Sequence, residues 1–320
     1  MAPGEQPTVP MPSGHQPVSR FGAEPRGASR FVDDLPETLE WTGEFGAELV
    51  LFNPFCRWLS REGHLRQRRI LTYRGMRCFY DDLDCREIVE KDEPRRWTIS
   101  QVDAPWLPVK DEITFDGLGR SALHVYADLR RKFGDLPLVP DIAADRPLLV
   151  VHNKYNIEWR GAPANYISLT ALDEIFRRLE HAFAIVYIRH GMAGRDPGYS
   201  EDFNLGLPFG DREVLERHPG VRSFDELYRA HVSGGGSYDI NTFKNVLYSR
   251  CRHFISSQGG GAHHIAFFSG SRLAIMHRKG PETEWAYRDG FYTFVSDVPP
   301  LLTVCASDDE LLASLGLFVP

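Results

Sequence analysis

The stretch His253-Phe-Ile-Ser-Ser-Gln-Gly-Gly-Gly-Ala-His-His-Ile-Ala-Phe-Phe-Ser-Gly270 decides the fold class of the chain. Its apolar, β-branched start predicts a strand over His253–Ser257, and the residues from Ala262 to Gly270 predict a helix. Glycines let the backbone approach a ligand closely, and the free N–H groups at the start of a helix favour an anion. The stretch therefore predicts a phosphate-binding turn, with a purely structural tight turn as the alternative.

This turn belongs to an alternation of strands and helices that begins near Pro147. Strands are predicted at Leu148–Val151, Phe183–Ile188, Val221–Phe224, His253–Ser257 and Arg272–His277. Helices are predicted at Ser168–Leu179, Asp225–His231, Asn241–Cys251 and Ala262–Gly270, with a last one opened by Asp308, Asp309 and Glu310 and continued by Leu311–Leu315. Strands separated by helices favour a parallel sheet covered on both faces. Residues 146–320 are therefore predicted to form a Rossmann-like domain.

The preceding residues 31–145 are predicted to form a smaller α/β domain with irregular connections. Its predicted strands are Glu48–Phe52, Arg69–Tyr73 and Trp97–Val102, and its predicted helices are Cys56–Gly63 and Ser121–Phe133. Residues 1–30 are rich in Pro, Gly, Ser and Gln, a composition typical of a flexible tail. The predicted fold class is thus α/β, with two Rossmann-like lobes and a disordered N-terminal tail.

Composition and charge narrow the possible classes of protein. The chain has 320 residues, 42% of them hydrophobic, and a formal net charge of -7, which argues against a nucleic-acid binder with a basic patch. The run Arg66-Gln-Arg-Arg69 is the exception, and a solvated helix end explains it better than contact with an anionic ligand or a membrane surface. Five scattered cysteines without a CxxC pair indicate neither a disulfide framework nor a zinc site. Lacking a long apolar run or a signal peptide, the chain is expected to be cytoplasmic.

Polar residues directly after the predicted strands would meet at one edge of the sheet. Asn153 and Lys154 follow the first strand, and Lys154 could neutralise a phosphate or be an ordinary surface lysine. Arg189 and His190 follow the second strand. Arg189 is a candidate to stabilise a departing diphosphate, and His190 is a candidate base, although a lone histidine is more often structural.

Further candidates lie in the glycine turn and in one loop. Ser256, Ser257 and Gln258 end the strand, Gly259, Gly260 and Gly261 form the turn, and His263 and His264 open the next helix. Glu201 and Asp202 are the acidic candidates of a loop, for which simple solvation is the alternative. Adjacent histidines without HxxxH spacing favour contact with an anion over a metal site, and no metal is expected.

The first domain contributes candidates for an acceptor. Asn53, Arg74, Arg77, Tyr80 and Asp81 come after predicted strand ends and would face a cleft if the two domains oppose one another. The segment Arg74-Gly-Met-Arg-Cys-Phe-Tyr80 mixes cationic and aromatic groups, as sugar and phosphate sites do. Ordinary packing explains the aromatic residues equally well.

The order of elements around Ser-Ser-Gln-Gly-Gly-Gly261 resembles the C-terminal nucleotide-sugar domain of GT-B glycosyltransferases. The stretch Phe254–Gln258 is similar to a serine-rich segment in the fucosyltransferase branch of that superfamily. The resemblance implies that the donor's diphosphate rests on the helix after the glycines and that Glu282 holds the ribose hydroxyls. It spans roughly residues 147–319, and its one specific motif is the glycine segment.

The resemblance implies a glycosyltransferase of hexosyl or fucosyl type, active in polysaccharide biosynthesis. It would move a sugar from a nucleotide sugar to a saccharide, glycoconjugate or other hydroxyl acceptor, without a metal or other cofactor. The backbone N–H groups of Gly260 and Gly261, with Arg189 or Lys154, would stabilise the leaving diphosphate, and His190 or a carboxylate would deprotonate the acceptor. Two alternatives stay open: another α/β transferase or hydrolase acting on a phosphorylated metabolite, and a non-catalytic nucleotide-binding protein.

Overall fold

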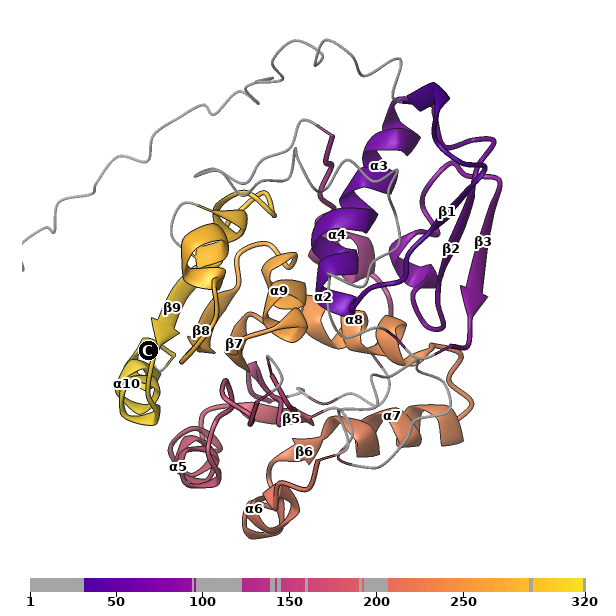
Figure 1. Cartoon of the computed structure of the whole chain (residues 1–320). Helices are drawn as coiled ribbons and strands as arrows, with labels where there is room; N and C mark the ends of the chain where they lie inside the picture. The colour runs from indigo at the N-terminus through magenta and orange to yellow at the C-terminus, as the bar shows by residue number, and fades with distance from the viewer. Residues whose placement is uncertain are drawn as a thin grey trace, which may run out of the picture.

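The computed structural model of the chain contains two parallel β-sheets covered by helices (Figure 1). It describes residues 32–93, 95, 123–138, 142, 145–158, 161–189, 192, 207–287 and 290–318. The predicted tail over residues 1–30, the whole predicted strand Trp97–Val102, and His190, Glu201 and Asp202 lie outside these residues. The predicted α/β fold class with two lobes is confirmed, while the boundary at residue 145 stays a prediction.

The second lobe is built on a sheet of six strands in the order β6-β5-β4-β7-β8-β9, and every neighbouring pair is parallel. The strands are β4 (Leu148–Asn153), β5 (Ala184–Arg189), β6 (Arg222–Ser223), β7 (His253–Ser257), β8 (Arg272–Met276) and β9 (Leu301–Cys305). Chain order reverses between β4 and β7, because β5 and β6 lie on one side of β4 and the later strands lie on the other. Open α/β sheets bind ligands outside the carboxyl ends of the strands at such a reversal.

Both faces of this sheet are buried, because alternate residues of each strand point to opposite sides. Leu149 and Val151 of β4 join one apolar cluster with α5 (Leu169–Leu179), α6 (Asp211–Arg217) and α10 (Asp308–Ser314). Leu148 and Val150 join another cluster with α7 (Phe224–Ser233), α8 (Ile240–Arg250) and α9 (Gly260–Ala266). The continuous apolar runs predicted a parallel sheet covered by helices on both faces. The structure confirms such a sheet.

The first lobe contains a parallel sheet of three strands, β1 (Thr38–Glu40), β2 (Arg69–Tyr73) and β3 (Glu87–Lys91). Its helical elements are α2 (Phe45–Ala47), η1 (Glu48–Phe52), α3 (Asn53–Arg61), η2 (Arg77–Phe79) and α4 (Leu129–Phe133). The predicted strand at Glu48–Phe52 is wrong, since these residues form a π-helical segment between α2 and α3. All five residues are buried, and a helix buried on every side gives the same unbroken apolar run as a buried strand.

The predicted helix Ser121–Phe133 is much shorter in the structure. Residues 123–128 are not helical, and α4 begins only after Asp128, whose carboxylate accepts hydrogen bonds from the N–H groups of Arg130 and Arg131. An aspartate in this N-cap position satisfies free N–H groups and so fixes where a helix starts. The strands β1, β3 and β9 and the helix α6 were not predicted.

The two lobes share one apolar core and meet where α2 packs against α9 (Figure 1). A Cβ atom added to Gly46 of α2 would lie 2.8 Å from the Cα of Gly260 in α9, and one added to Gly260 would lie 3.1 Å from the N of Gly46. Two glycines face each other at this crossing, and neither position has room for a side chain. The remaining short helices are η6 (Thr283–Tyr287), η7 (Phe291–Thr293) and η8 (Leu315–Leu317). In the described part of the chain, no helix is both long and apolar enough to span a membrane.

Candidate functional site

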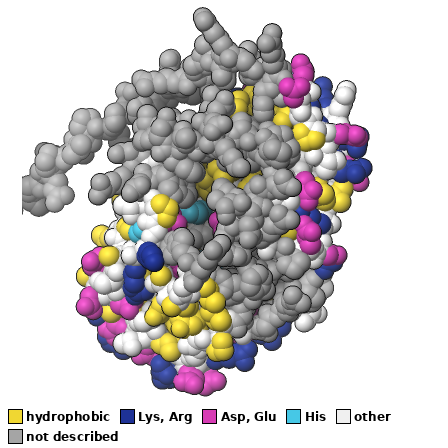
Figure 2. Space-filling view, in the orientation of Figure 1, with side chains coloured by type: hydrophobic (Ala, Val, Ile, Leu, Met, Phe, Trp, Pro, Cys, Tyr) yellow, Lys and Arg dark blue, Asp and Glu magenta, His cyan; other side chains and the backbone are white. Residues whose placement is uncertain are grey.

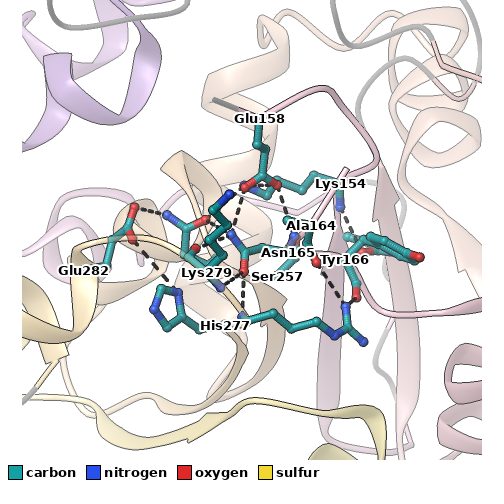
Figure 3. Close-up of polar contacts among 12 residues, drawn as sticks. Lys154, Glu158, Ala164, Asn165, Tyr166, Ser257, His277, Lys279 and Glu282 are labelled. Carbon is teal, nitrogen blue, oxygen red and sulfur yellow. Dashed lines mark hydrogen bonds and ion pairs between the residues drawn. The ribbon is translucent and has the colours of Figure 1, made fainter. Parts of the chain in front are cut away.

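Polar side chains converge at the carboxyl ends of β4, β7 and β8, where the order of the strands reverses. Lys154 directly follows β4, Gln258 follows β7, and His277 follows β8. Figure 3 shows Lys154 and Glu158 on one side of this group, Glu282 and His277 on the other, and Asn165 between them. The sheet therefore brings together residues that lie more than a hundred positions apart in the sequence.

Lys154 supplies the positive charge of this site. Its Nζ lies 3.0 Å from Oε1 of Gln258 and 3.0 Å from Oε1 of Glu158. Gly259 makes the close approach possible, since a Cβ at that position would lie 3.1 Å from Nζ, and its φ of +131° disfavours any other residue. The side chain of Lys154 keeps 20% of its surface exposed.

Asn165 ties the segment after β4 to the segment after β8. Its Nδ2 lies 2.8 Å from Oε2 of Glu158 and 3.0 Å from Oε1 of Gln258, and its Oδ1 accepts hydrogen bonds from the backbone N–H groups of Arg278 and Lys279 (Figure 3). A buried amide with this many partners holds the site in one geometry. Sequence reasoning missed both Asn165 and Glu158, because neither follows a predicted strand nor belongs to a motif.

Glu282 and His277 form the least satisfied part of the site. Nε2 of Gln258 donates to Oε1 of Glu282, while Oε2 of Glu282 lies 4.0 Å from Nδ1 of His277, too far for a hydrogen bond. These two atoms, together with Oγ of Ser257 and the hydroxyl of Tyr287, are buried without a hydrogen-bond partner within the described residues. Buried polar atoms are nearly always paired with protein groups, ordered water or a ligand, so these four atoms mark where water or a ligand would hydrogen-bond.

The protonation of this pair follows from its burial. Burial raises the pKa of Glu282, against the opposing effect of Lys154, and burial also lowers the pKa of His277. Both shifts favour the uncharged forms. The two side chains thus present hydrogen-bonding groups more than fixed charges, and the fixed charges beside them are those of the Lys154–Glu158 ion pair.

His263 stands next to this pair as a neutral side chain. The hydroxyl of Tyr292 lies 3.2 Å from its Nδ1, and burial, followed by the charges of Lys154 and His277, lowers its pKa to about 3. His264 turns into the core, where its Nε2 lies 2.6 Å from Oδ1 of Asn245. Neither imidazole therefore supplies the positive charge that the prediction of anion contact requires.

Each glycine of the turn has its own structural reason. Gly259 has a positive φ, Gly260 packs against Gly46, and a Cβ on Gly261 would lie 1.7 Å from Cε1 of His152. Packing alone therefore requires all three glycines. This favours the structural explanation of the triplet, and anion binding by the backbone of the turn stays a prediction.

Three other residues that were predicted to contact the donor use their polar atoms for hydrogen bonds or an ion pair within the second lobe. Asn153 exchanges hydrogen bonds with the backbone of Ile167, and Oγ of Ser256 donates to the carbonyl of Ser257. Arg189 makes a buried two-pronged ion pair with Asp211 in the first turn of α6, with a distance of 2.9 Å from Nη2 to Oδ1. Its guanidinium is paired with Asp211 in this structure, and the predicted contact with a leaving group stays a prediction.

The predicted acceptor-side residues separate into two kinds. Asn53 is buried in α3 and donates to the carbonyl of Phe79, and Tyr80 is fully buried with its hydroxyl 2.9 Å from Oε1 of Glu48. These two side chains hold the first lobe together and do not face a cleft. Arg74 and Arg77 are exposed and pair with Asp92 and Glu90, so an acceptor role for them stays a prediction. Asp81 pairs with Lys132.

No group of three or more His, Cys, Asp or Glu side chains among the residues that the structure describes is arranged to hold a metal ion. Residues 190, 201 and 202 lie outside the described residues, and metal independence stays a prediction.

Comparison with known proteins gives one structural similarity. No protein-family model and no curated protein matches the sequence. Among solved structures, the ADP-heptose lps heptosyltransferase II of E. coli is similar with a TM-score of 0.49 and 11% sequence identity, over 88% of this chain and 97% of that chain. The comparisons do not confirm the resemblance to the fucosyltransferase branch. At this TM-score and identity the similarity gives no information on substrate or chemistry.

Proposed function

We propose that the chain is a glycosyltransferase whose nucleotide-sugar donor binds at the carboxyl ends of β4, β7 and β8. The observation that carries this proposal is the set of unpaired buried atoms on Glu282, His277 and Ser257, beside the ammonium group of Lys154. A ligand that pairs all of them needs hydroxyl groups at one end and a negative charge at the other. A nucleoside diphosphate with its ribose has both.

The positions of the residues support an order for the ligand along this edge. A ribose hydroxyl between Oε2 of Glu282 and Nδ1 of His277, which lie 4.0 Å apart, would hydrogen-bond to both. The diphosphate would then extend past Gln258 toward Lys154, whose Nζ is held by Gln258 and Glu158. This order places the sugar beyond Lys154.

The proposed reaction transfers the sugar from the diphosphate to an acceptor hydroxyl. The bond between the anomeric carbon and the diphosphate oxygen breaks, a bond to the acceptor oxygen forms, and the acceptor proton passes to a base. Lys154 would stabilise the negative charge that develops on the leaving diphosphate. His190, Glu201 and Asp202 are the candidate bases. We propose that no metal takes part and that the acceptor is a saccharide or another hydroxyl compound.

Replacing Lys154 with methionine is expected to weaken binding of nucleoside diphosphates by about 10- to 100-fold, because a charge-assisted contact of roughly 1.5–3 kcal/mol is lost. Isothermal titration calorimetry with a panel of nucleoside diphosphates measures this change. The matched control is Arg222→Met, which removes an exposed cation from β6 of the same sheet. Equal affinities of Lys154→Met and the wild-type protein would show that the ligand does not bind beside Lys154.

Three assays separate glycosyl transfer from the two alternatives. A glycosyltransferase with a nucleotide sugar but no acceptor slowly releases nucleoside diphosphate, and it does so faster with the right acceptor. An enzyme acting on another phosphorylated metabolite would hydrolyse or transfer that compound while ignoring nucleotide sugars. A non-catalytic protein would bind nucleotides, shown by a rise in melting temperature, without turnover. Absence of both binding and turnover with every nucleotide sugar would exclude the proposed function.

A further inference from the structure

The outer edge of β9 presents unpaired backbone groups. Within the described residues β9 pairs only with β8, and it is the last strand of the six-stranded sheet (Figure 1). The N–H of Leu301 donates to the carbonyl of Ser271, and the carbonyl of Cys305 accepts from the N–H of His277. Residues 301, 303 and 305 therefore turn their backbone groups inward, and Leu302 and Val304 turn their N–H and C=O groups outward.

Exposed apolar side chains gather at the same edge. The described part of the chain has six large apolar side chains that are exposed, and three of them lie on β9 or just before it: Val298 (58%), Leu301 (61%) and Val304 (38%). A fourth, Leu317 (49%), lies in η8, and its carbonyl accepts a hydrogen bond from Arg272 of β8. In Figure 2, apolar side chains reach the surface among charged ones on the flank where Figure 1 places β9 and α10. Such a concentration marks an interaction surface more than a scatter of single residues does.

The strand has none of the features that normally prevent edge pairing. Its sequence Leu301-Leu-Thr-Val-Cys305 contains no charged residue and no proline, whereas exposed edges usually have lysines, prolines or bulges. The described residues also form no helix or strand over this edge. Among the described residues, this edge therefore has no strand partner besides β8.

We propose that β9 pairs with β9 of a second copy of this chain, antiparallel and around a two-fold axis through Thr303. In this register Leu302 lies opposite Val304 of the second copy, and each such pair exchanges two backbone hydrogen bonds through the groups that face outward. Thr303 then faces Thr303 of the second copy in a pair without backbone hydrogen bonds. The two sheets become one continuous sheet.

The sequence of the strand favours a second copy over a different partner. Thr303 lies between two apolar residues, Leu302 and Val304. A two-fold axis through Thr303 therefore places apolar residues opposite apolar residues and threonine opposite threonine. Both kinds of cross-strand pair are stabilising, and no like charges face each other. The same surface on both partners is what a two-fold interface requires. Val298 and Leu317 are also exposed, and burying them in the interface would bring its area closer to the roughly 1,000 Å² that specific interfaces bury.

Disulfide cross-linking tests the register. In a Cys85→Ser background, which removes the half-buried native thiol, Thr303→Cys places two thiols where antiparallel Cα atoms are about 4.5 Å apart, within the range for a disulfide. Mild oxidation is expected to give about tenfold more cross-linked dimer than the control Val232→Cys, an exposed position on α7. Equal cross-linking of the two variants would overturn the proposed register.

Sedimentation equilibrium tests the association itself. The wild-type protein is expected to change from monomer to dimer as its concentration rises, and Val304→Lys to weaken the association at least about tenfold by placing a charge at the interface. Val232→Lys adds the same charge at an exposed site elsewhere and should dimerise like the wild type. A wild-type protein that stays monomeric at all concentrations would refute the proposal. Nucleotide binding should be the same in all of these variants, so either proposal can fail without the other.

Discussion

Gly261→Ala is expected to lower the free energy of unfolding by about 3 kcal/mol or more, at the upper end of the usual cost of overpacking a core. The added Cβ would lie 1.7 Å from Cε1 and 2.0 Å from Nδ1 of His152. His152 is buried on the central strand β4, and its imidazole is held between the sheet and α9. The methyl group must therefore displace the buried imidazole of His152 or shift α9 away from β4.

Urea denaturation of this variant and of Gly316→Ala measures the effect. The control adds the same methyl group where no atom lies within 4 Å, so its stability should stay within about 0.5 kcal/mol of the wild type. The double variant His152→Ala/Gly261→Ala removes the clashing ring and should lose less than the sum of the two single changes. If Gly261→Ala were as stable as Gly316→Ala, α9 could not pack on β4 as closely as described.

The glycine triplet shows where sequence reasoning succeeded and where it stopped. The strand β7 on one side was predicted with its observed bounds, and a helix was predicted on the other side, but α9 spans Gly260–Ala266 and not the predicted Ala262–Gly270. The reasons for the glycines were not local, since Gly259 faces Lys154, Gly260 faces Gly46 and Gly261 faces His152. A turn that packs against distant residues has the same sequence as one that opens toward a ligand.

The same distinction applies to the charged residues predicted at the edge of the sheet. Placing Lys154 there followed from its position after a strand, and the structure puts it beside Gln258 as expected from two neighbouring parallel strands. Arg189 also follows a strand, but its guanidinium pairs with Asp211, 22 positions further along the chain. A residue's position directly after a strand predicts at which edge of the sheet it lies. The partner of the Arg189 side chain, however, is on α6, a helix that the sequence pattern did not predict.

Acidification from pH 7.5 to pH 5 is expected to lower the free energy of unfolding by at least about 6 kcal/mol, about 2 kcal/mol from each of the three buried histidines whose pKa falls to about 3, with His253, His264 and His277 acting in the same direction. Burial lowers the pKa of His124 and His263 to about 3, and burial together with Lys244 and Lys154 does the same for His152. In the unfolded chain these groups take up protons near pH 6.5. Between pH 6.5 and 3 the unfolded state therefore binds more protons than the folded state, and stability falls as the pH falls.

Urea denaturation at pH 7.5, 6.5 and 5.0 measures this loss, which is as large as the whole stability of many domains. His263→Asn should reduce the difference between pH 7.5 and pH 5 by about 2 kcal/mol, because one of the three neutral imidazoles is gone. His64→Asn, a substitution at an exposed position, is the matched control. A stability that does not vary over this range would mean that the folded protein protonates these imidazoles, which their burial beside Lys154 and Lys244 opposes. The contacts of α9 with β4 and Tyr292 would then have to be looser than the structure shows.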